Sequence, residues 1–221
     1  MIPLRSTERV QSRANVTPVL IAINALVFFY QVSLPTYALN TFVDHWGIVP
    51  DHLRVVSLAT SMFLHGGWLH IIGNMLFLWV FGRNLEDLIG GPKFLAFYLI
   101  CGLASAVVHV MFNPYSRIPT IGASGAIAGV MGAYLIKFPR ARIITLVPIF
   151  VFVTTMEIPA AWLLIYWLAI QFFSGIGSLA EADYTGGGTA WFAHIGGFLA
   201  GMLLIRFFPE QRRWRSWSSD V

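Results

Sequence analysis

Residues 122–136 have the sequence GASGAIAGVMGAYLI. It is almost wholly apolar, which predicts a helix buried in protein or lipid. A lone serine in such a helix usually packs and hydrogen-bonds a carbonyl one turn earlier. Ser124 differs because glycines flank the Ala123-Ser124 dipeptide and let the backbone approach a substrate. It also begins the helix, where unpaired N–H groups favour a developing negative charge.

The composition predicts a membrane protein rather than a soluble domain. Hydrophobic residues make up 57% of the 221 residues and charged residues only 11%, and the mean hydropathy is +0.72. Apolar stretches of about 20 residues are long enough to cross a hydrocarbon core. The net charge of +4 does not indicate a nucleic-acid partner, because the basic residues lie at the ends of apolar stretches.

The apolar stretches predict an all-α polytopic membrane domain of six transmembrane helices over residues 17–208. Residues 1–16 are expected to form a cytoplasmic N-terminal tail, and residues 209–221 a basic cytoplasmic C-terminal tail. No leader sequence is expected, because a polar segment precedes the first apolar stretch. The expected spans cover about residues 17–32, 68–85, 93–112, 124–138, 158–175 and 191–208.

Three segments between the spans have their own patterns. Residues 34–61 mix polar and aromatic residues, which predicts a segment half embedded among the lipid headgroups. Residues 143–156, IITLVPIFVFVTTM, are too short to span and rich in β-branched residues, so we expect an extended hairpin at the inner face. Residues 176–190 are expected to be a flexible acidic outer loop.

The positions of the basic residues predict the orientation. With this layout twelve of the fourteen Lys and Arg residues fall on one side, and only Arg54 and Arg117 on the other. Because cytoplasmic loops are enriched in Lys and Arg, both termini are expected in the cytoplasm. Ser124 then lies toward the outer half of the membrane. The short tails favour a prokaryotic plasma membrane.

Two further polar clusters interrupt apolar spans at the same expected depth. His70 and Asn74 are spaced i, i+4 and share a helix face, so both could donate hydrogen bonds to an oxyanion. His194 shares a face with Gly197 and Gly201. A second small-residue pair, Gly125 and Gly129, lies in the span that Ser124 begins. Such faces let helices approach closely, so we expect the two spans to pack and bring His194 within reach of Ser124.

The remaining candidate residues predict no cofactor and no metal. Cys101 is the single cysteine and lies in an apolar run, which predicts an inert buried thiol. His109 is expected to be a boundary or core residue, and His45 and His52 to be solvated in the outer loop. His65 is five residues before His70 and off its face, which weakens a paired-histidine metal site. No carboxylate lies in a span beside His194, so we expect a Ser–His pair without an acidic third member.

Three motifs in order resemble the rhomboid intramembrane serine proteases. They are HGGWLHIIGN at residues 65–74, GASG at 122–125 and AHIGGFLAG at 193–201. The resemblance implies a six-helix rhomboid-like bundle with a watered cavity that opens outward. It also implies hydrolysis of peptide bonds in or next to a transmembrane helix of a substrate protein. Ser124 matches the family's nucleophile and His194 its general base, while His70, Asn74 and the Ser124 backbone N–H match its oxyanion hole. Gly122, Gly125, Gly197 and Gly201 are expected to pack around the site.

Two positions depart from the family pattern. Val56 and Ser57 stand where many members have a Trp-Arg pair in the first outer loop. Ala128 stands where some members have a tyrosine that stacks on the histidine, and the sequence does not indicate what orients His194 instead.

Two other functions would also use residues of these motifs. One is a non-catalytic protein that binds transmembrane segments, and the other is a transporter or metal carrier that uses His65, His70 and His194. A non-catalytic binding protein would have another residue in place of Ser124 or His194, and both are present here. Paired acidic residues within the spans would indicate a transporter, and the predicted spans contain none. The lipid bilayer and transmembrane protein substrates are therefore the expected partners.

Overall fold

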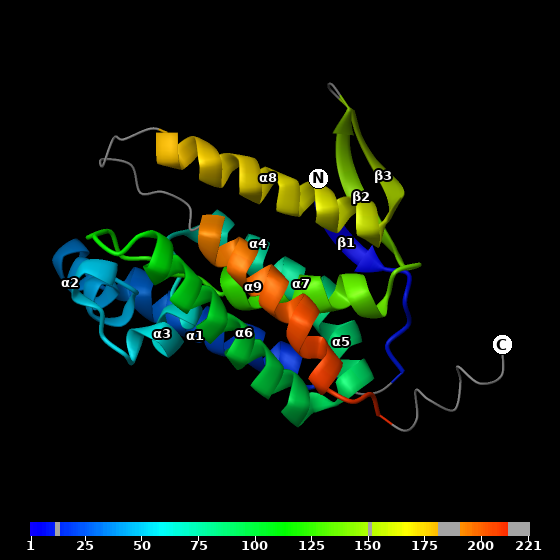
Figure 1. Ribbon diagram of the computed structural model, residues 1–221, viewed down its shortest axis with the longest axis horizontal. Helices are drawn as coiled ribbons and strands as arrows, with labels where there is room; N and C mark the ends of the chain where they lie inside the picture. The colour runs from blue at the N-terminus through cyan, green and yellow to red at the C-terminus, as the bar shows by residue number, and fades with distance from the viewer. Residues whose placement is uncertain (12–13, 150–151, 181–190, 212–221) are drawn as a thin grey trace.

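The structure is a computed structural model, and it describes residues 1–11, 14–149, 152–180 and 191–211 (Figure 1). It is mainly helical, with short 3-10 turns and one small sheet. The helices are α1 (Val16–Ser33), α2 (Thr36–Trp46), α3 (Ser57–Thr60), α4 (Trp68–Phe77), α5 (Arg83–Ile89), α6 (Gly91–Phe112), α7 (Ser124–Lys137), α8 (Ala160–Ala180) and α9 (Trp191–Leu204).

The predicted second span is one continuous helical segment with a wider turn inside it. A π-helical stretch, η3 (Leu78–Gly82), joins α4 to α5. The segment ends at Gly90, whose φ of +90° lies in the region that only glycine adopts without strain. Pro92 then stands in the first turn of α6, where its missing N–H costs no hydrogen bond. This Gly-Gly-Pro turn reverses the chain, so that α6 packs against α5.

Two of the helices are long and apolar enough to cross a bilayer alone, namely α1 and α6. Residues Ser57–Phe63 and Trp68–Ile89, bent by 95° at their break, would count as a third crossing if they form one span. Three further apolar segments are shorter: Ser124–Lys137, Ala160–Ser174 and Trp191–Phe207. The described residues thus contain six apolar helical segments at the predicted places, and the six-span count stays a prediction.

Helix α7 forms the centre of the core, and it is buried from Gly125 to Tyr134. Figure 1 shows α9 lying against it, with α6 beside both. Bulky aromatic side chains fill the space around α7 toward its C-terminal end, and Ser124 stands at its other end. The fully buried aromatic residues are Phe81, Phe94, Phe97, Tyr98, Tyr134 and Phe198.

Residues Arg142–Ile149 (β2) and Phe152–Pro159 (β3) pair as antiparallel strands, which confirms the hairpin predicted for 143–156. The N-terminal segment Ile2–Ser6 (β1) adds a third strand beside β2, with Ile2 opposite Leu146. This strand was not predicted, because residues 1–16 were expected to be a tail. The fold is therefore helical with one small sheet rather than purely α-helical.

Short helices occupy much of the segment between the first two predicted spans. Residues 34–61 contain α2, α3 and the turn η1 (Pro50–His52), and an isolated bridge pairs Ile48 with Thr120, just before α7. Residues 176–180 continue α8 instead of starting the outer loop. The rest of that predicted loop, 181–190, and most of the C-terminal tail, 212–221, lie outside the described residues.

Candidate active site

Ser124 is the first residue of α7, and the chain before it is held in a conformation that requires glycine. Gly122 has a φ of +130°, and its N–H donates to the Ser61 carbonyl at 2.9 Å. A Cβ at this position would come within 2.8 Å of the His70 ring. Gly122 therefore lets the chain pass directly over His70 and carry Ser124 to the edge of a cavity.

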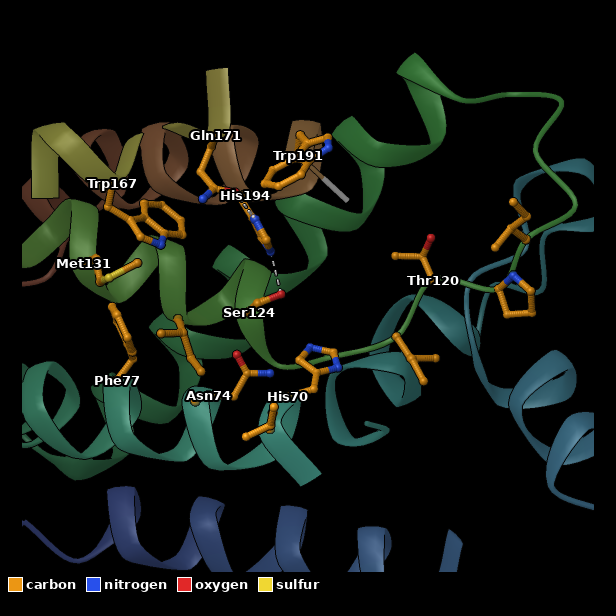
Figure 2. A pocket seen from close by; sticks show the side chains of 16 residues that line it. His70, Asn74, Phe77, Thr120, Ser124, Met131, Trp167, Gln171, Trp191 and His194 are labelled. Atoms are coloured by element: carbon orange, nitrogen blue, oxygen red, sulfur yellow. Dashed lines mark hydrogen bonds between the residues drawn. The ribbon is translucent and has the colours of Figure 1, made fainter. Parts of the chain in front are cut away.

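His194 on α9 and Ser124 on α7 form a hydrogen bond of 2.7 Å between His194 Nε2 and Ser124 Oγ (Figure 2). The two helices can approach this closely because glycines meet at their crossing. A Cβ on Gly197 would run into the Gly125 carbonyl, and one on Gly201 into that of Gly129. The glycines singled out in the sequence thus face one another, one turn apart on each helix.

The other nitrogen of His194 is bonded to a residue that the sequence analysis did not single out. Gln171 on α8 has its Oε1 at 2.6 Å from His194 Nδ1. Trp167, one turn earlier on α8, lies beside the ring at 5.6 Å between centroids. His194 is only 8% exposed. Its ring is therefore contacted on two sides by α8, while Ala128 of α7 provides no ring.

Two polar side chains of α4 face Ser124 from below in Figure 2. His70 Nδ1 accepts the Gly66 N–H at 3.3 Å, so Nε2 carries the proton in the neutral ring. This Nε2 points at Gly122. Asn74 Nδ2 is buried and has no hydrogen-bond partner among the described residues. A buried unpaired donor costs about 1–3 kcal/mol, so an acceptor that arrives in the cavity would recover this energy.

The cavity beside these residues has a volume of about 520 Å³ and is walled by α4, α7, α8 and α9 together with the loop before Ser124. Its inner end is apolar, with Phe77, Met131 and Trp167 around it. Polar groups gather at one place on its wall, where Ser124, His194 and the α4 donors meet. A chain laid in this cavity would contact apolar walls and present one carbonyl to the polar cluster.

His65 lies next to His70, with 5.1 Å between the ring centroids, whereas His109 and His52 lie outside the polar cluster. Burial and the neighbouring His70 lower the pKa of His65, in the loop before α4, to about 4. His109 is buried and its Nε2 lies 2.8 Å from Thr120 Oγ1, which ties α6 to the loop before α7. His52 is half exposed beside Asp44 and Asp51.

The alternative metal site finds no geometric support in the described part of the chain. There, no three or more His, Cys, Asp or Glu side chains gather as they would around a metal ion. Cys101 is a free, buried thiol.

Comparisons with known proteins point to one family. The family model described as Rhomboid domain matches residues 52–211. Rhomboid protein 1, mitochondrial, of Saccharomyces cerevisiae is 31% identical over 154 residues, which are 67% of this chain and 40% of the yeast protein. The Bacillus subtilis rhomboid protease GluP is 41% identical over 78 residues, 35% of this chain and 15% of that protein.

A third relative matches more of the chain. The mouse presenilin-associated rhomboid-like protein, mitochondrial, is 30% identical over 203 residues, 86% of this chain and 48% of the mouse protein. The chain therefore spans less than half the length of these curated relatives.

Proposed function

The chain belongs to the rhomboid family, and on that premise we propose that it is an intramembrane serine endopeptidase working through Ser124 and His194. It is an integral membrane protein, and its family supports intramembrane proteolysis in general. The observation that carries the proposal is the 2.7 Å hydrogen bond between His194 Nε2 and Ser124 Oγ. A serine hydroxyl becomes a useful nucleophile only when a base stands ready to take its proton.

The proposed reaction follows from this contact. Ser124 Oγ attacks the scissile carbonyl carbon while His194 Nε2 takes the hydroxyl proton. The tetrahedral intermediate collapses when the protonated His194 gives that proton to the leaving amine, and the acyl group remains on Ser124. Water then attacks the ester with His194 again as the base, and Ser124 leaves with its proton restored.

We assign the oxyanion of the intermediate to three donors: His70 Nε2–H, the Asn74 amide and the Ser124 backbone N–H. The first two face the cavity from α4, and neither would need to break a hydrogen bond to a described residue in order to turn toward the new charge. The third belongs to the first residue of α7, where N–H groups have no partner within the helix. Gly122, Gly125, Gly197 and Gly201 keep the backbone close enough for these groups to act together.

The substrates are proposed to be single-span or other transmembrane proteins, cut in or next to a membrane helix. The apolar inner end of the cavity supports this choice, because it suits apolar side chains of an extended segment. A peptide bond inside a helix is shielded by its neighbours, so the segment must unwind before its carbonyl reaches Ser124. Substrate helices weakened by glycine or proline are therefore expected to be cut faster than uniformly stable ones.

We also propose six membrane crossings within residues 17–208, by α1, the α4–α5 segment, α6, α7, α8 and α9. The distribution of Lys and Arg supports both termini on the cytoplasmic side. A prokaryotic plasma membrane is the proposed location, and the Bacillus subtilis relative supports it. The names of the yeast and mouse relatives assign those two proteins to mitochondria.

The test is cleavage of a panel of single-span substrates by purified protein in detergent and in proteoliposomes. Ser124→Ala should abolish cleavage and also labelling by a fluorophosphonate probe, which reacts with activated serines. His194→Ala should do the same, because the base is lost. Ser33→Ala is the matched serine control, since Ser33 Oγ donates to the Tyr30 carbonyl at the exposed end of α1.

The outcome also separates a protease from a protein that merely binds transmembrane segments. A binding protein would retain its substrates in pull-downs yet leave the fluorophosphonate unreacted in the wild type. Undiminished cleavage by Ser124→Ala would refute the assignment of the nucleophile.

A further inference from the structure

The imidazole of His194 needs something to hold it, and the residue that does so comes from α8. A neutral histidine can act as a general base only when its ring proton is on the nitrogen that faces away from the nucleophile. For His194 that nitrogen is Nδ1, because Nε2 faces Ser124 Oγ at 2.7 Å. The hydrogen-bond partner of Nδ1 therefore determines whether His194 is in the tautomer that can accept the Ser124 proton.

We propose that Gln171 is the positioning residue that fixes the tautomer and the direction of the His194 ring, an inference that depends on the proposed protease function. The amide oxygen of Gln171 lies 2.6 Å from His194 Nδ1, and an amide oxygen can only accept. Nδ1 must then carry the hydrogen, which leaves the lone pair of Nε2 free for the Ser124 hydroxyl. Gln171 takes the place that a carboxylate has in a Ser–His–Asp triad, but without its charge.

The contact is built into the fold. Gln171 is 6% exposed and His194 8% exposed, so water does not compete strongly for Nδ1. Trp167, at i−4 from Gln171 and so on the same face of α8, lies beside the imidazole with the two planes at 42°. The tryptophan limits rotation of the ring while the amide defines its hydrogen bond. Gln171 and Trp167 on α8 thus orient the His194 ring, which Ala128 on α7 is too small to contact in this way.

Gln171 is neutral, so it places no permanent negative charge beside the base. In the part of the chain that the structure describes, the titratable groups that act on His194 electrostatically are His70 on α4 and His109 on α6, both imidazoles. A carboxylate introduced at residue 171 would therefore be the only nearby anion among these groups. It would stabilise the protonated form of His194, and this form cannot act as a base.

The test compares Gln171→Leu and Gln171→Glu with the wild type, measuring kcat, KM and their pH dependence on one transmembrane substrate. Gln171→Leu keeps the size of the side chain but removes the acceptor, so the Nε2–H tautomer becomes available. We expect kcat to fall about 10–100-fold, the usual loss when a positioning partner is removed, with KM little changed. The variant should still fold, as judged by its melting temperature and its elution in detergent.

Gln171→Glu tests the pH dependence of kcat/KM, which would not change if Gln171 had only a structural role. The carboxylate keeps the hydrogen bond to Nδ1, so the tautomer is retained, but His194 stays protonated to higher pH. The acidic limb of the profile of kcat/KM against pH should move to higher pH, with activity recovered above it. Tyr166→Phe is the matched control, because it removes a polar group from the exposed face of α8 without touching His194.

The possible results separate this inference from the function on which it rests. A wild type that neither cleaves nor reacts with fluorophosphonate would overturn both. A wild type that cleaves, with Gln171→Leu at full kcat and Gln171→Glu with an unmoved acidic limb, would overturn only the role of Gln171. If Gln171→Leu fails to fold, the pH profile of Gln171→Glu decides alone.

Discussion

At the scale of single residues, the candidate active site contains a polar group that has no hydrogen-bond partner among the described residues. This group is the amide nitrogen of Asn74, which is buried. A buried donor in this state lowers stability, so the proposed oxyanion role of Asn74 would have a cost in the free energy of unfolding. The cost and the benefit can be measured on the same variant.

Replacing Asn74 with leucine should lower activity and leave the protein as stable as before or more so. Removing one oxyanion donor typically lowers kcat about 10²–10³-fold, with KM little affected because the oxyanion exists only beyond the ground state. Melting temperature and steady-state kinetics check the two halves of this prediction.

The matched control is Asn24→Leu on α1. Asn24 is fully buried and lies outside the cavity lining. Its amide nitrogen donates to the Leu20 carbonyl at 2.8 Å, whereas its Oδ1 has no partner among the described residues. This variant should change kcat far less than Asn74→Leu. Equal losses of kcat in both would contradict an oxyanion role for Asn74.

Gly122→Ala should damage the site even though it adds one carbon. The added Cβ would lie 2.8 Å from the His70 ring, and the φ of +130° is unfavourable for alanine. The chain or His70 must shift, and a displacement of about 1 Å near the reacting atoms can cost 10²-fold in rate. Gly73→Ala is the control, because its Cβ would meet no atom within 4 Å although Gly73 lines the same cavity.

These two variants are compared by cleavage rate and by melting temperature. Gly122→Ala is expected to lose both activity and stability. Gly73→Ala should gain stability, since alanine is favoured over glycine in a helix by about 0.5–1 kcal/mol. A fully active Gly122→Ala would show that the approach of the chain to His70 is not needed.

The sequence indicated most of the polar residues of the site but not what holds them. Ser124, His70, Asn74 and His194 stood out because they are polar residues within apolar runs, in a familiar order. Gln171 is equally polar and equally embedded, yet it has no motif around it. Its significance depends on how α8 packs against α9, and a one-dimensional pattern does not contain that information.

At the scale of elements, the crossing of α7 and α9 brings together Ser124 and His194 of the proposed dyad. The glycine pairs bring the two backbones into contact, and a side chain on either helix would force them apart. Gly201 is two turns from His194, so a substitution there can change the crossing without touching the reacting groups. It therefore tests the helix packing by itself.

Gly201→Ala should destabilise the protein by about 1–3 kcal/mol, the usual cost of overpacking a tight contact. Its Cβ would run into the Gly129 backbone, which cannot turn away as a flexible side chain could. The rate of fluorophosphonate labelling should also fall, because the displaced α9 carries His194 away from Ser124.

Leu199→Ala provides the comparison on the same helix. Leu199 is 47% exposed on the outer face of α9, so its loss should leave the labelling rate unchanged in detergent. An unchanged melting temperature and labelling rate for Gly201→Ala would mean that the crossing tolerates a side chain.

The local sequence pattern predicted the β2–β3 hairpin but not β1, the third strand of the sheet. Residues 143–156 have the β-branched composition of a hairpin, and the two strands are adjacent in the chain, so their pairing is a local event. Strand β1 pairs instead with residues about 140 positions later, contains Pro3 and spans only five residues. No local signal reveals such a partner, and the six helical segments were predictable because their apolar length is itself local.

At the scale of the whole molecule, the exterior of the helices is apolar where a lipid would cover it. Leu26 and Phe29 on α1 and Trp162 and Phe173 on α8 are all more than half exposed. Exposed apolar surface of this extent is unfavourable in water. Composition alone predicted this property, whereas the number of crossings depends on how the shorter helices α7, α8 and α9 lie in the bilayer.

The proposed topology predicts which surface residues can be reached from each side of the membrane. Tyr115, in the loop after α6, is 86% exposed and should face outward, and Thr154 in β3 is exposed and should face the cytoplasm. Cysteine introduced at 115 should react with a membrane-impermeant maleimide in intact cells. Cysteine at 154 should react only after the membrane is permeabilised, because the reagent cannot cross lipid.

The native chain suits this measurement, since its one cysteine, Cys101, is fully buried and should not react. The two positions are separated by α7 alone among the helices, so the experiment tests directly whether this 14-residue helix crosses the bilayer. Labelling of both positions in intact cells would mean that α7 returns to the side from which it entered. Opposite accessibility would establish α7 as a crossing and bring Ser124, at its first residue, to the outward half of the membrane.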